Sequence, residues 1–276
     1  MRLLAAVDFG ATHGSVVATA KALGEALGLE PLLLHVVPDP YFQGLARHFP
    51  ELKKPLQEVL AQVEARVEEA LRATGLKAWV LRGLPAFVVG GEAHRAKLVI
   101  LGQVGEAPLE RLARGGIARY LLHRGEAPVL LVPAEKPLTQ VRRIGVGVDE
   151  SDAALAAFRL AEAWGKRLGA EVQAFHLVSG EGGCCYPTYL DPKNLSLAQV
   201  LAQAEAHLSG RYPGVQVFKG ENPEDLLEVA QRVQVDLLVL GSKAKSTWRH
   251  RLGQMVEGAL KHAELPLLIV PEATVW

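Results

Sequence analysis

The feature of this sequence that most constrains its fold is an internal repeat. The segment RLLAAVDFG near the start recurs as RIGVGVDES, which aligns Asp8 with Asp149. Three later blocks recur in the same order: PLLLHVV as VQAFHLV, AKLVILG as VDLLVLG, and APVLLVP as LPLLIVP. The spacing between the copies drifts only slightly, as small loop deletions would cause. Chance similarity would not keep four blocks collinear, so the sequence indicates one domain present twice.

The two copies are joined near PAEKPLTQ, where two prolines and several charges indicate a short exposed linker. We therefore place the first domain at residues 1–138 and the second at residues 139–276. With 276 residues, of which 49% are hydrophobic, the chain is long enough for each copy to bury a core of its own.

Apolar runs alternate with helical patterns in each copy. In the first copy these runs are LLAAVD, PLLLHVV, KAWVLRG, KLVILG and PVLLVP. Runs that are apolar throughout predict strands covered on both faces, and their alternation with helices predicts parallel crossover connections. Each copy is therefore expected to be a doubly wound, Rossmann-like α/β domain.

Two helices can be predicted in more detail. In residues 52–75 the apolar side chains recur with the spacing of one buried stripe, and Gly75 marks the expected end of the helix. The stripe consists of Leu56, Val59, Leu60, Val63, Val67, Ala70 and Leu71. In the second copy, Asn222 is expected to cap a helix that begins at Pro223, with two acidic residues near the positive end of its dipole.

Charge and residue spacing argue against several function classes. Thirty basic and thirty acidic residues balance, so neither nucleic acid nor an anionic membrane is an expected partner. No apolar run is long enough to span a membrane, and Asp8 comes too early for a signal peptide, so a cytoplasmic location is expected. Cys184 and Cys185 are adjacent, which suits neither a disulfide framework nor a zinc site. His35 and His176 lie in apolar strands and indicate a structural role; no metal site or catalytic residue is assigned.

In doubly wound sheets, ligands bind beyond the carboxyl ends of strands where the strand order reverses. The loops after the first and fourth runs are therefore the candidate site. In the first copy they hold Asp8 and the stretch GQVGEAPLERLARGG. Glycines let a backbone approach a phosphate closely, and the amides of a following helix donate to it. The stretch is either a phosphate-binding loop or a flexible turn.

These segments resemble the universal stress protein family. The resemblance rests on the strand ending in Val-Asp, the LLHVV strand, the G-x-P before the third helix, the LVILG strand and a G-x2-G-x9-G pattern, and it covers both halves. It implies two tandem flavodoxin-like domains, each a five-stranded parallel sheet with helices on both faces. It also implies ATP as a cofactor, with magnesium as an optional companion ion, because one subgroup of the family binds ATP through the pattern G-x2-G-x9-G-[ST].

The two copies depart from that pattern to different degrees. The first keeps Gly102, Gly105 and Gly115 but has Gly116 in place of the family's hydroxyl residue. The second is degenerate, because Ala244 replaces the second glycine and Gln254 the hydroxyl residue, and one residue is missing before Gly253. Losing one hydroxyl donor to a charged acceptor costs roughly 1.5 to 3 kcal/mol, which weakens a site without abolishing it. Basic residues near both loops are candidate phosphate contacts or simply solvated: Arg111, Arg114 and Arg119 in the first copy, and Lys243, Lys245, Arg249, His250 and Arg251 in the second.

The resemblance supplies the candidate nucleotide-binding residues. In the first copy they are Ala6, Val7, Asp8, Val36, Leu101, Gly102, Gly105, Gly115, Gly116 and Ile117. In the second they are Gly147, Val148, Asp149, Leu177, Leu240, Gly241, Ala244, Gly253, Gln254 and Met255. The two aspartates have two possible roles: a carboxylate that positions the nucleotide, or a cap for the turn that follows.

Three functions are compatible with the sequence. The first is an ATP-binding stress-response regulator, with nucleotide in the first copy and also in the degenerate second site. The second is an interaction module that binds no nucleotide, and the third is a slow ATP hydrolase, at most a weak one. The fifth strands, PVLLVP and PLLIVP, are expected at sheet edges, and apolar edges are normally paired. We therefore expect an internal pseudo-dimer of the two domains, with a homodimer of the whole chain as a further option.

Overall fold

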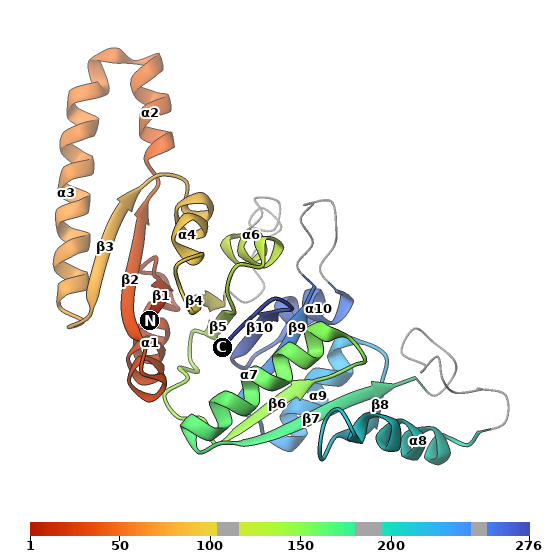
Figure 1. The fold of residues 1–276 in the computed structure, drawn as a ribbon. Coiled ribbons are helices and arrows are strands. Elements are labelled where there is room, and N and C mark those ends of the chain that lie inside the picture. Colours follow the sequence, from red (N-terminus) through yellow and green to blue (C-terminus); the bar gives the residue numbers. More distant parts are fainter. Residues whose placement is uncertain (104–115, 180–194, 244–252) are drawn as a thin grey trace. The chain divides into compact units, whose positions relative to one another are not determined.

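The computed structural model describes residues 1–103, 116–179, 195–243 and 253–276. The chain divides into two compact units, one made of Met1–Leu121 with Val129–Thr139 and the other of Leu122–Pro128 with Gln140–Trp276. Both are α/β units whose strands are parallel, as Figure 1 shows. The prediction of two tandem Rossmann-like domains is confirmed.

The first unit contains a five-stranded parallel sheet in the order β3-β2-β1-β4-β5. Its strands are β1 (Arg2–Ala6), β2 (Glu30–Val37), β3 (Lys77–Arg82), β4 (Leu98–Gln103) and β5 (Val129–Pro133). The centre of the sheet is fully apolar, since Leu3, Leu4 and Ile100 are all buried. The order reverses between β1 and β4, whose carboxyl ends lie side by side. The candidate site lies beyond these ends.

Helices connect these strands and cover both faces of the sheet. They are α1 (His13–Leu27), α2 (Asp39–His48), the 3-10 turn η1 (Pro50–Leu52), α3 (Lys53–Arg72), α4 (Pro85–Ala93) and α6 (Ile117–Arg124). Right-handed crossovers place α1 and α3 on one face and α4 on the other. Helix α1 ends at Gly28, whose φ of 66° places it in the left-handed conformation that favours glycine.

The second unit repeats the same order as β8-β7-β6-β9-β10. Its strands are β6 (Arg143–Gly147), β7 (Glu171–Val178), β8 (Gln216–Lys219), β9 (Leu237–Ser242) and β10 (Leu267–Pro271). Its helices are α7 (Asp152–Leu168), α8 (Leu197–Ser209), α9 (Pro223–Val233) and α10 (Gln254–His262). Each strand of the repeat found in the sequence therefore occupies the same place in its own sheet.

The predicted start of α9 is confirmed. The side chain of Asn222 accepts a hydrogen bond from the backbone N–H of Asp225 at 2.9 Å. The carboxylate of Asp225 accepts from the backbone N–H of Asn222 at 3.2 Å in return, and Pro223 is the first helical residue. This reciprocal cap satisfies two amides that a helix start leaves without intrahelical partners.

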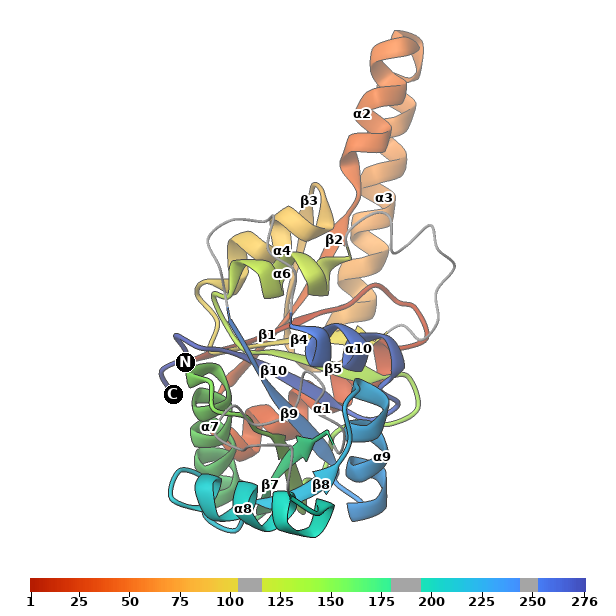
Figure 2. The same ribbon diagram turned by 90° about the vertical axis from the view of Figure 1, so that its right-hand side faces the viewer.

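The long helix of the first unit differs from its prediction in two ways. It ends at Arg72, three residues before Gly75. Helix α2 and the turn η1 precede it, so that α2 and α3 form a helical hairpin. Only Leu60 and Leu71 of the predicted stripe are buried, whereas Val59 and Val63 remain 47% and 38% exposed. Figures 1 and 2 show the reason: α2 and the start of α3 rise beyond the ends of β2 and β3, where no strand covers them.

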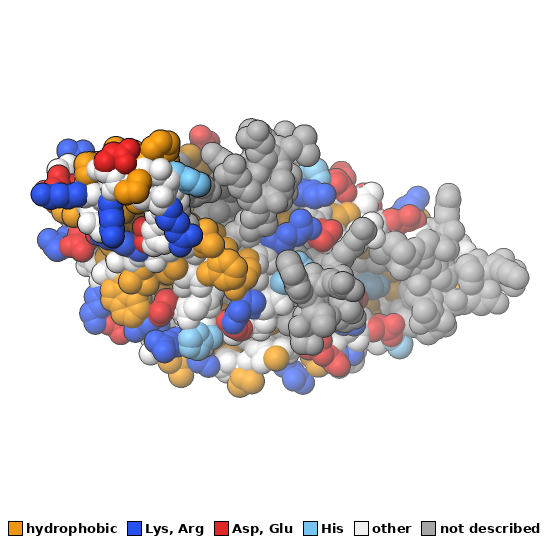
Figure 3. All heavy atoms as spheres, turned by 90° about the horizontal axis from the view of Figure 1, so that it is seen from above, with side chains coloured by type: hydrophobic (Ala, Val, Ile, Leu, Met, Phe, Trp, Pro, Cys, Tyr) orange, Lys and Arg blue, Asp and Glu red, His pale blue; other side chains and the backbone are white. Residues whose placement is uncertain are grey.

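Further apolar side chains on this hairpin are exposed, namely Leu45, Phe49 and Leu52. Figure 3, seen from above, shows apolar side chains at the surface between lysines, arginines and acidic residues. Over the described parts of the chain, no helix combines the length and the apolar character that a membrane span requires.

Candidate functional site

Most of the predicted site residues of the first unit lie at the carboxyl end of its sheet. Asp8 follows β1, Val36 lies near the end of β2, and Leu101 and Gly102 lie in β4. Gly116 precedes α6, and Ile117 is its first residue. Gly105 and Gly115 lie outside the described residues, as do Arg111 and Arg114, so the central part of the glycine stretch keeps the status of a sequence prediction.

The second unit has the equivalent arrangement. Asp149 follows β6, Leu177 lies in β7, and Leu240 and Gly241 lie in β9. Gly147 lies so close to Leu240 that a Cβ at Gly147 would meet Leu240 Cδ2 at 2.6 Å. Gly253 caps α10, which begins with Gln254 and Met255, and no side chain accepts a hydrogen bond at this cap. Ala244, Lys245, Arg249, His250 and Arg251 lie outside the described residues, whereas Lys243 is described and exposed.

The two strand-end aspartates make the same local contact. Asp8 Oδ1 accepts the backbone N–H of Gly10 at 2.8 Å, and Asp149 Oδ1 accepts that of Ser151 at 2.8 Å. Both side chains are exposed. Each aspartate therefore holds its own turn with one oxygen, and among the described residues no donor meets the other oxygen. Capping and nucleotide contact can thus coexist on one carboxylate.

In each unit, a histidine ties two neighbouring strand ends together beneath the candidate site. His35 Nδ1 donates to the carbonyl of Val7 at 2.8 Å, and His176 Nδ1 donates to the carbonyl of Val148 at 2.7 Å. Burial lowers the pKa of His176, which keeps its ring neutral. These bonds join β2 to the end of β1, and β7 to the end of β6, as expected of structural histidines.

The first glycine of each glycine pattern has a packing role. A Cβ at Gly102 would overlap the side chain of Thr12, which precedes α1. A Cβ at Gly241 would overlap the backbone of Ala153 and Ala154, in the first turn of α7. The end of the fourth strand thus passes directly beneath the start of the first helix in each unit. The sequence explained these glycines only by the close approach of a phosphate to the backbone. The structure adds a second explanation, since a side chain at either position would overlap the start of the first helix.

The turn after β1 contains a residue that sequence reasoning missed. Phe9 has a φ of 59° and is 40% exposed. Its ring stacks on that of His13, with centroids 4.6 Å apart and planes 16° apart, and lies 5.2 Å from the ring of His35. An aromatic residue directly after the strand-end aspartate was the available signal, but residue type alone does not reveal a left-handed backbone.

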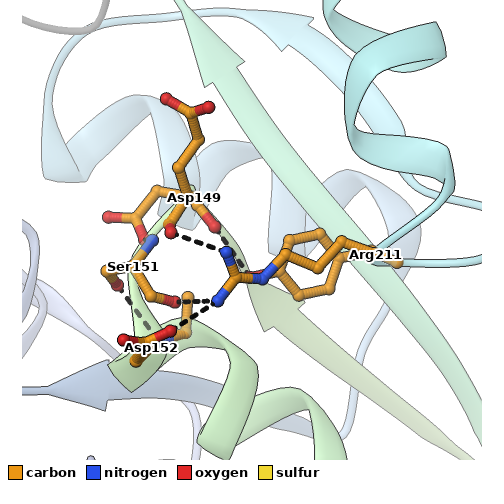
Figure 4. Close-up of polar contacts among 7 residues, drawn as sticks. Asp149, Ser151, Asp152 and Arg211 are labelled. Atoms are coloured by element: carbon orange, nitrogen blue, oxygen red, sulfur yellow. Dashed lines mark hydrogen bonds and ion pairs between the residues drawn. The ribbon is translucent and has the colours of Figure 1, made fainter.

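The turn after β6 is held by two side chains that follow α8 in the sequence. Arg211 donates to the carbonyls of Glu150 at 2.9 Å and Ser151 at 3.4 Å, and it pairs with the carboxylate of Asp152 at 2.8 Å (Figure 4). The hydroxyl of buried Tyr212 donates to the carbonyl of Asp149 at 2.7 Å. Burial raises the pKa of Tyr212 to about 12, so this donor keeps its proton.

His207, in the last turn of α8, completes this arrangement by pairing with the carboxylate of Glu150 at 2.8 Å. We call these three residues, His207, Arg211 and Tyr212, the α8 clamp. They follow the turn by about sixty residues in the chain and form no motif with it, so no local sequence signal indicates the contact.

The first helix of each unit begins differently. The first turn of α7 contains Asp152, and Ser151 Oγ accepts the N–H of Ala154 at 3.1 Å. Helix α1 begins after Thr12, whose side chain makes no cap hydrogen bond, and its first turn holds no acidic residue. Because the amino end of a helix carries partial positive charge, α1 presents this charge uncompensated by an acid of its own first turn, whereas α7 does not.

The described residues contain no group of three or more histidine, cysteine or acidic side chains that could hold a metal ion. The turn after β1 presents backbone amides, the carboxylate of Asp8 and the ring of Phe9, whereas the turn after β6 carries the carboxylates of Glu150 and Asp152 paired with His207 and Arg211.

Comparison with known proteins gives a consistent result. The model of the universal stress protein family matches residues 1–133 and again residues 140–271. A universal stress protein of Mycobacterium tuberculosis is 26% identical over 211 residues, which cover 72% of this chain and 66% of that relative. The chain thus spans just under two thirds of the length of this relative. Another, from Methanocaldococcus jannaschii, is 32% identical over 87 residues, or 31% of this chain and 50% of the relative.

Solved structures show the same fold along the whole chain. The crystal structure of a universal stress protein from Archaeoglobus fulgidus matches with a TM-score of 0.64 and 18% identity, covering 99% of this chain and 98% of that one. A putative universal stress protein from Pseudomonas aeruginosa matches with a TM-score of 0.62 and 14% identity, over 98% of this chain and 93% of that one.

Proposed function

Because the chain belongs to the universal stress protein family, with the family's domain present twice, we propose that it is a stress-response regulator that binds ATP at the carboxyl ends of β1 and β4. The observation that carries this proposal is the turn after β1. In this turn, one oxygen of Asp8 has no donor among the described residues, and the first turn of α1 contains no acidic residue. Both features lie beside β4, the strand that leads into the glycine stretch. These are the two polar features that a nucleotide requires, one for the base or ribose and one for the phosphates.

Each residue has a role in this proposal. The second oxygen of Asp8 accepts a hydrogen bond from the adenine or ribose. Val7 and Val36, both buried, give the apolar floor under the base. The backbone from Gly102 through the glycine stretch to Gly116 and Ile117 approaches the phosphates, with magnesium as their counter-ion.

The second unit is proposed as the weaker site. The first turn of α7 contains Asp152, which pairs with Arg211, and the α8 clamp occupies the carbonyls of the neighbouring turn. The degenerate glycine pattern with Ala244 and Gln254 points in the same direction. Binding there depends on the start of α10, where no side chain caps the first amides.

The experiment that tests the proposal is mass spectrometry of nucleotide released on denaturing freshly purified protein, followed by titration of the stripped protein with ATP. We expect released ATP and a titratable site. Repeated absence of nucleotide together with no measurable binding would contradict the proposal and leave the interaction module as the better account.

The assembly proposed from the sequence concerns the fifth strands. Each is the last strand in the order of its own unit, and both are apolar throughout, as VLLVP in β5 and LLIVP in β10. Pairing of two such edges within one chain would form a pseudo-dimer with approximate two-fold symmetry. An experimental structure in which β5 and β10 lie apart with both edges in solvent would contradict this.

A further inference from the structure

The backbone of Phe9 is unusual for a residue of its kind. Among the described residues, only Phe9 and Gln234 combine a side chain with a positive φ, at 59° and 60°. The positive φ of Gln234 follows from its position, because this residue caps the end of α9 and its N–H donates to the carbonyls of Ala230 and Gln231. Phe9 ends no helix. A bulky aromatic residue in the left-handed region is strained, and such outliers concentrate at binding sites.

Burial does not explain why the chain accepts this strain. The ring of Phe9 packs against His13 and His35, yet 40% of the residue remains exposed. A core residue would gain more by turning inward. The left-handed backbone instead keeps a large flat side chain beside Asp8, at the carboxyl end of β1, with two imidazole rings that fix its orientation.

Among the described residues, the turn after β6 has no equivalent ring. Glu150 occupies the corresponding position after Asp149. Its carboxylate pairs with His207 and its carbonyl accepts from Arg211, so this position is tied to the α8 clamp. Within the described residues, the exposed aromatic ring therefore distinguishes the turn after β1 from the turn after β6.

We infer that Phe9 is the residue on which the base of the bound nucleotide stacks, an inference that rests on the function proposed above. His13 stacks on one face of the ring, and the 40% of the residue that stays exposed leaves surface for a planar heteroaromatic group, while Asp8 beside it offers the oxygen that fixes the edge of that group. Base stacking on an aromatic side chain depends on ring area and tolerates different bases. Phe9 therefore selects a nucleotide over a bare polyphosphate.

The test is isothermal titration of wild type and Phe9→Gly with ATP and, separately, with inorganic tripolyphosphate. Glycine removes the ring and its contacts with His13 and His35 but adopts the left-handed backbone without strain, which offsets part of that loss, so the variant should still fold. We expect ATP affinity to fall about tenfold to a hundredfold, with tripolyphosphate affinity unchanged. Phe9→Trp should retain ATP affinity, because it keeps a π-surface.

The matched control is Gln234→Gly, which relieves the other positive φ in the second unit and should leave ATP affinity unchanged. Equal ATP affinity in wild type and Phe9→Gly would overturn the inference while leaving the proposed function intact. An equal loss for ATP and tripolyphosphate would also overturn it, because the ring would then act on the phosphates or the fold. Failure of wild type to bind ATP would overturn both the inference and the proposed function.

Discussion

Asp8 has one oxygen committed to its own turn and one in solvent, and Asp8→Asn separates these two roles. Asparagine keeps the acceptor for the N–H of Gly10, so the melting temperature without ligand should barely change. If the second oxygen accepts from the nucleotide, an amide donor in its place should weaken ATP binding by roughly 1.5 to 3 kcal/mol. Thermal melting with and without ATP measures both effects.

The control for this prediction is Asp149→Asn, which makes the same change in the second unit and should leave the first site unaffected. An equal ATP-induced rise in melting temperature for wild type and the Asp8 variant, with the second site disabled in both, would show that Asp8 only caps its turn.

Gly102 and Gly241 should respond differently to the same change. In Gly102→Ala the new Cβ overlaps a side chain, so Thr12→Gly in the same chain should recover much of the lost stability. In Gly241→Ala the new Cβ overlaps backbone atoms of Ala153 and Ala154, which no truncation removes. Overpacking typically costs about 1 to 3 kcal/mol. Urea unfolding of the two single variants and the Thr12 double variant measures this, and failure of Thr12→Gly to restore any stability would contradict the packing explanation.

At the scale of elements, the α8 clamp should make the second unit sensitive to alkaline pH. The pKa of Tyr212 lies above the ordinary value of about 10, at about 12 in the folded protein. The folded state therefore holds this proton more tightly than the unfolded chain. The resulting stability is fully present below pH 10 and is lost as the pH rises towards 12.

Denaturant unfolding of the second unit between pH 8 and 12 tests this. Tyr212→Phe should lower the unfolding free energy by about 0.5 to 1.5 kcal/mol near neutral pH, through the lost bond to the carbonyl of Asp149. The variant should also lose the part of the alkaline decline that Tyr212 causes. A decline of the same size in the variant would assign it to other groups.

Two neighbouring residues of α3 test how that element is held. Leu60 is 3% exposed and contributes to the core under the helix, whereas Val59 is 47% exposed. Leu60→Ala should cost about 2 to 5 kcal/mol, as large-to-small changes in cores do. Val59→Ala should change stability by at most about 0.5 kcal/mol, as is usual for surface positions. Urea unfolding of both variants checks this, and comparable losses would mean that something covers Val59 in solution.

The elements that the sequence predicted are those whose signals are local. Strands follow from apolar runs, and the start of α9 follows from Asn222 and Pro223, because both depend on a few adjacent residues. The exposure of Val59 could not be predicted, since periodicity gives the apolar face of a helix but not the length of the strand beneath it. For the candidate site, Asp8 and the glycines were predicted from a pattern. The left-handed backbone of Phe9 and the reach of Arg211 depend on contacts distant in the sequence, and those need the folded chain.

For the whole molecule, the differences between the units predict unequal sites. Titration of nucleotide-free protein with ATP should show one tight site per chain and a second, weaker one or none. Asp8→Asn should affect the tight site and Asp149→Asn the weaker. Two sites of equal affinity would contradict the asymmetry inferred from the α8 clamp and the start of α7.

Because the turn of the second unit is held by the α8 clamp, we expect the stability of the two halves to depend differently on the ATP concentration. Asp152, in the first turn of its first helix, pairs with Arg211, and Arg211 also occupies two carbonyls of the turn, so the second half is proposed to respond less to ATP. The first half, if it binds ATP as proposed, gains stability that follows the ATP concentration, about 2.7 kcal/mol when ATP exceeds its dissociation constant a hundredfold. If the second half binds ATP more weakly as proposed, its unfolding transition shifts only at higher ATP concentrations, so the gap between the two transitions should vary with the ATP concentration.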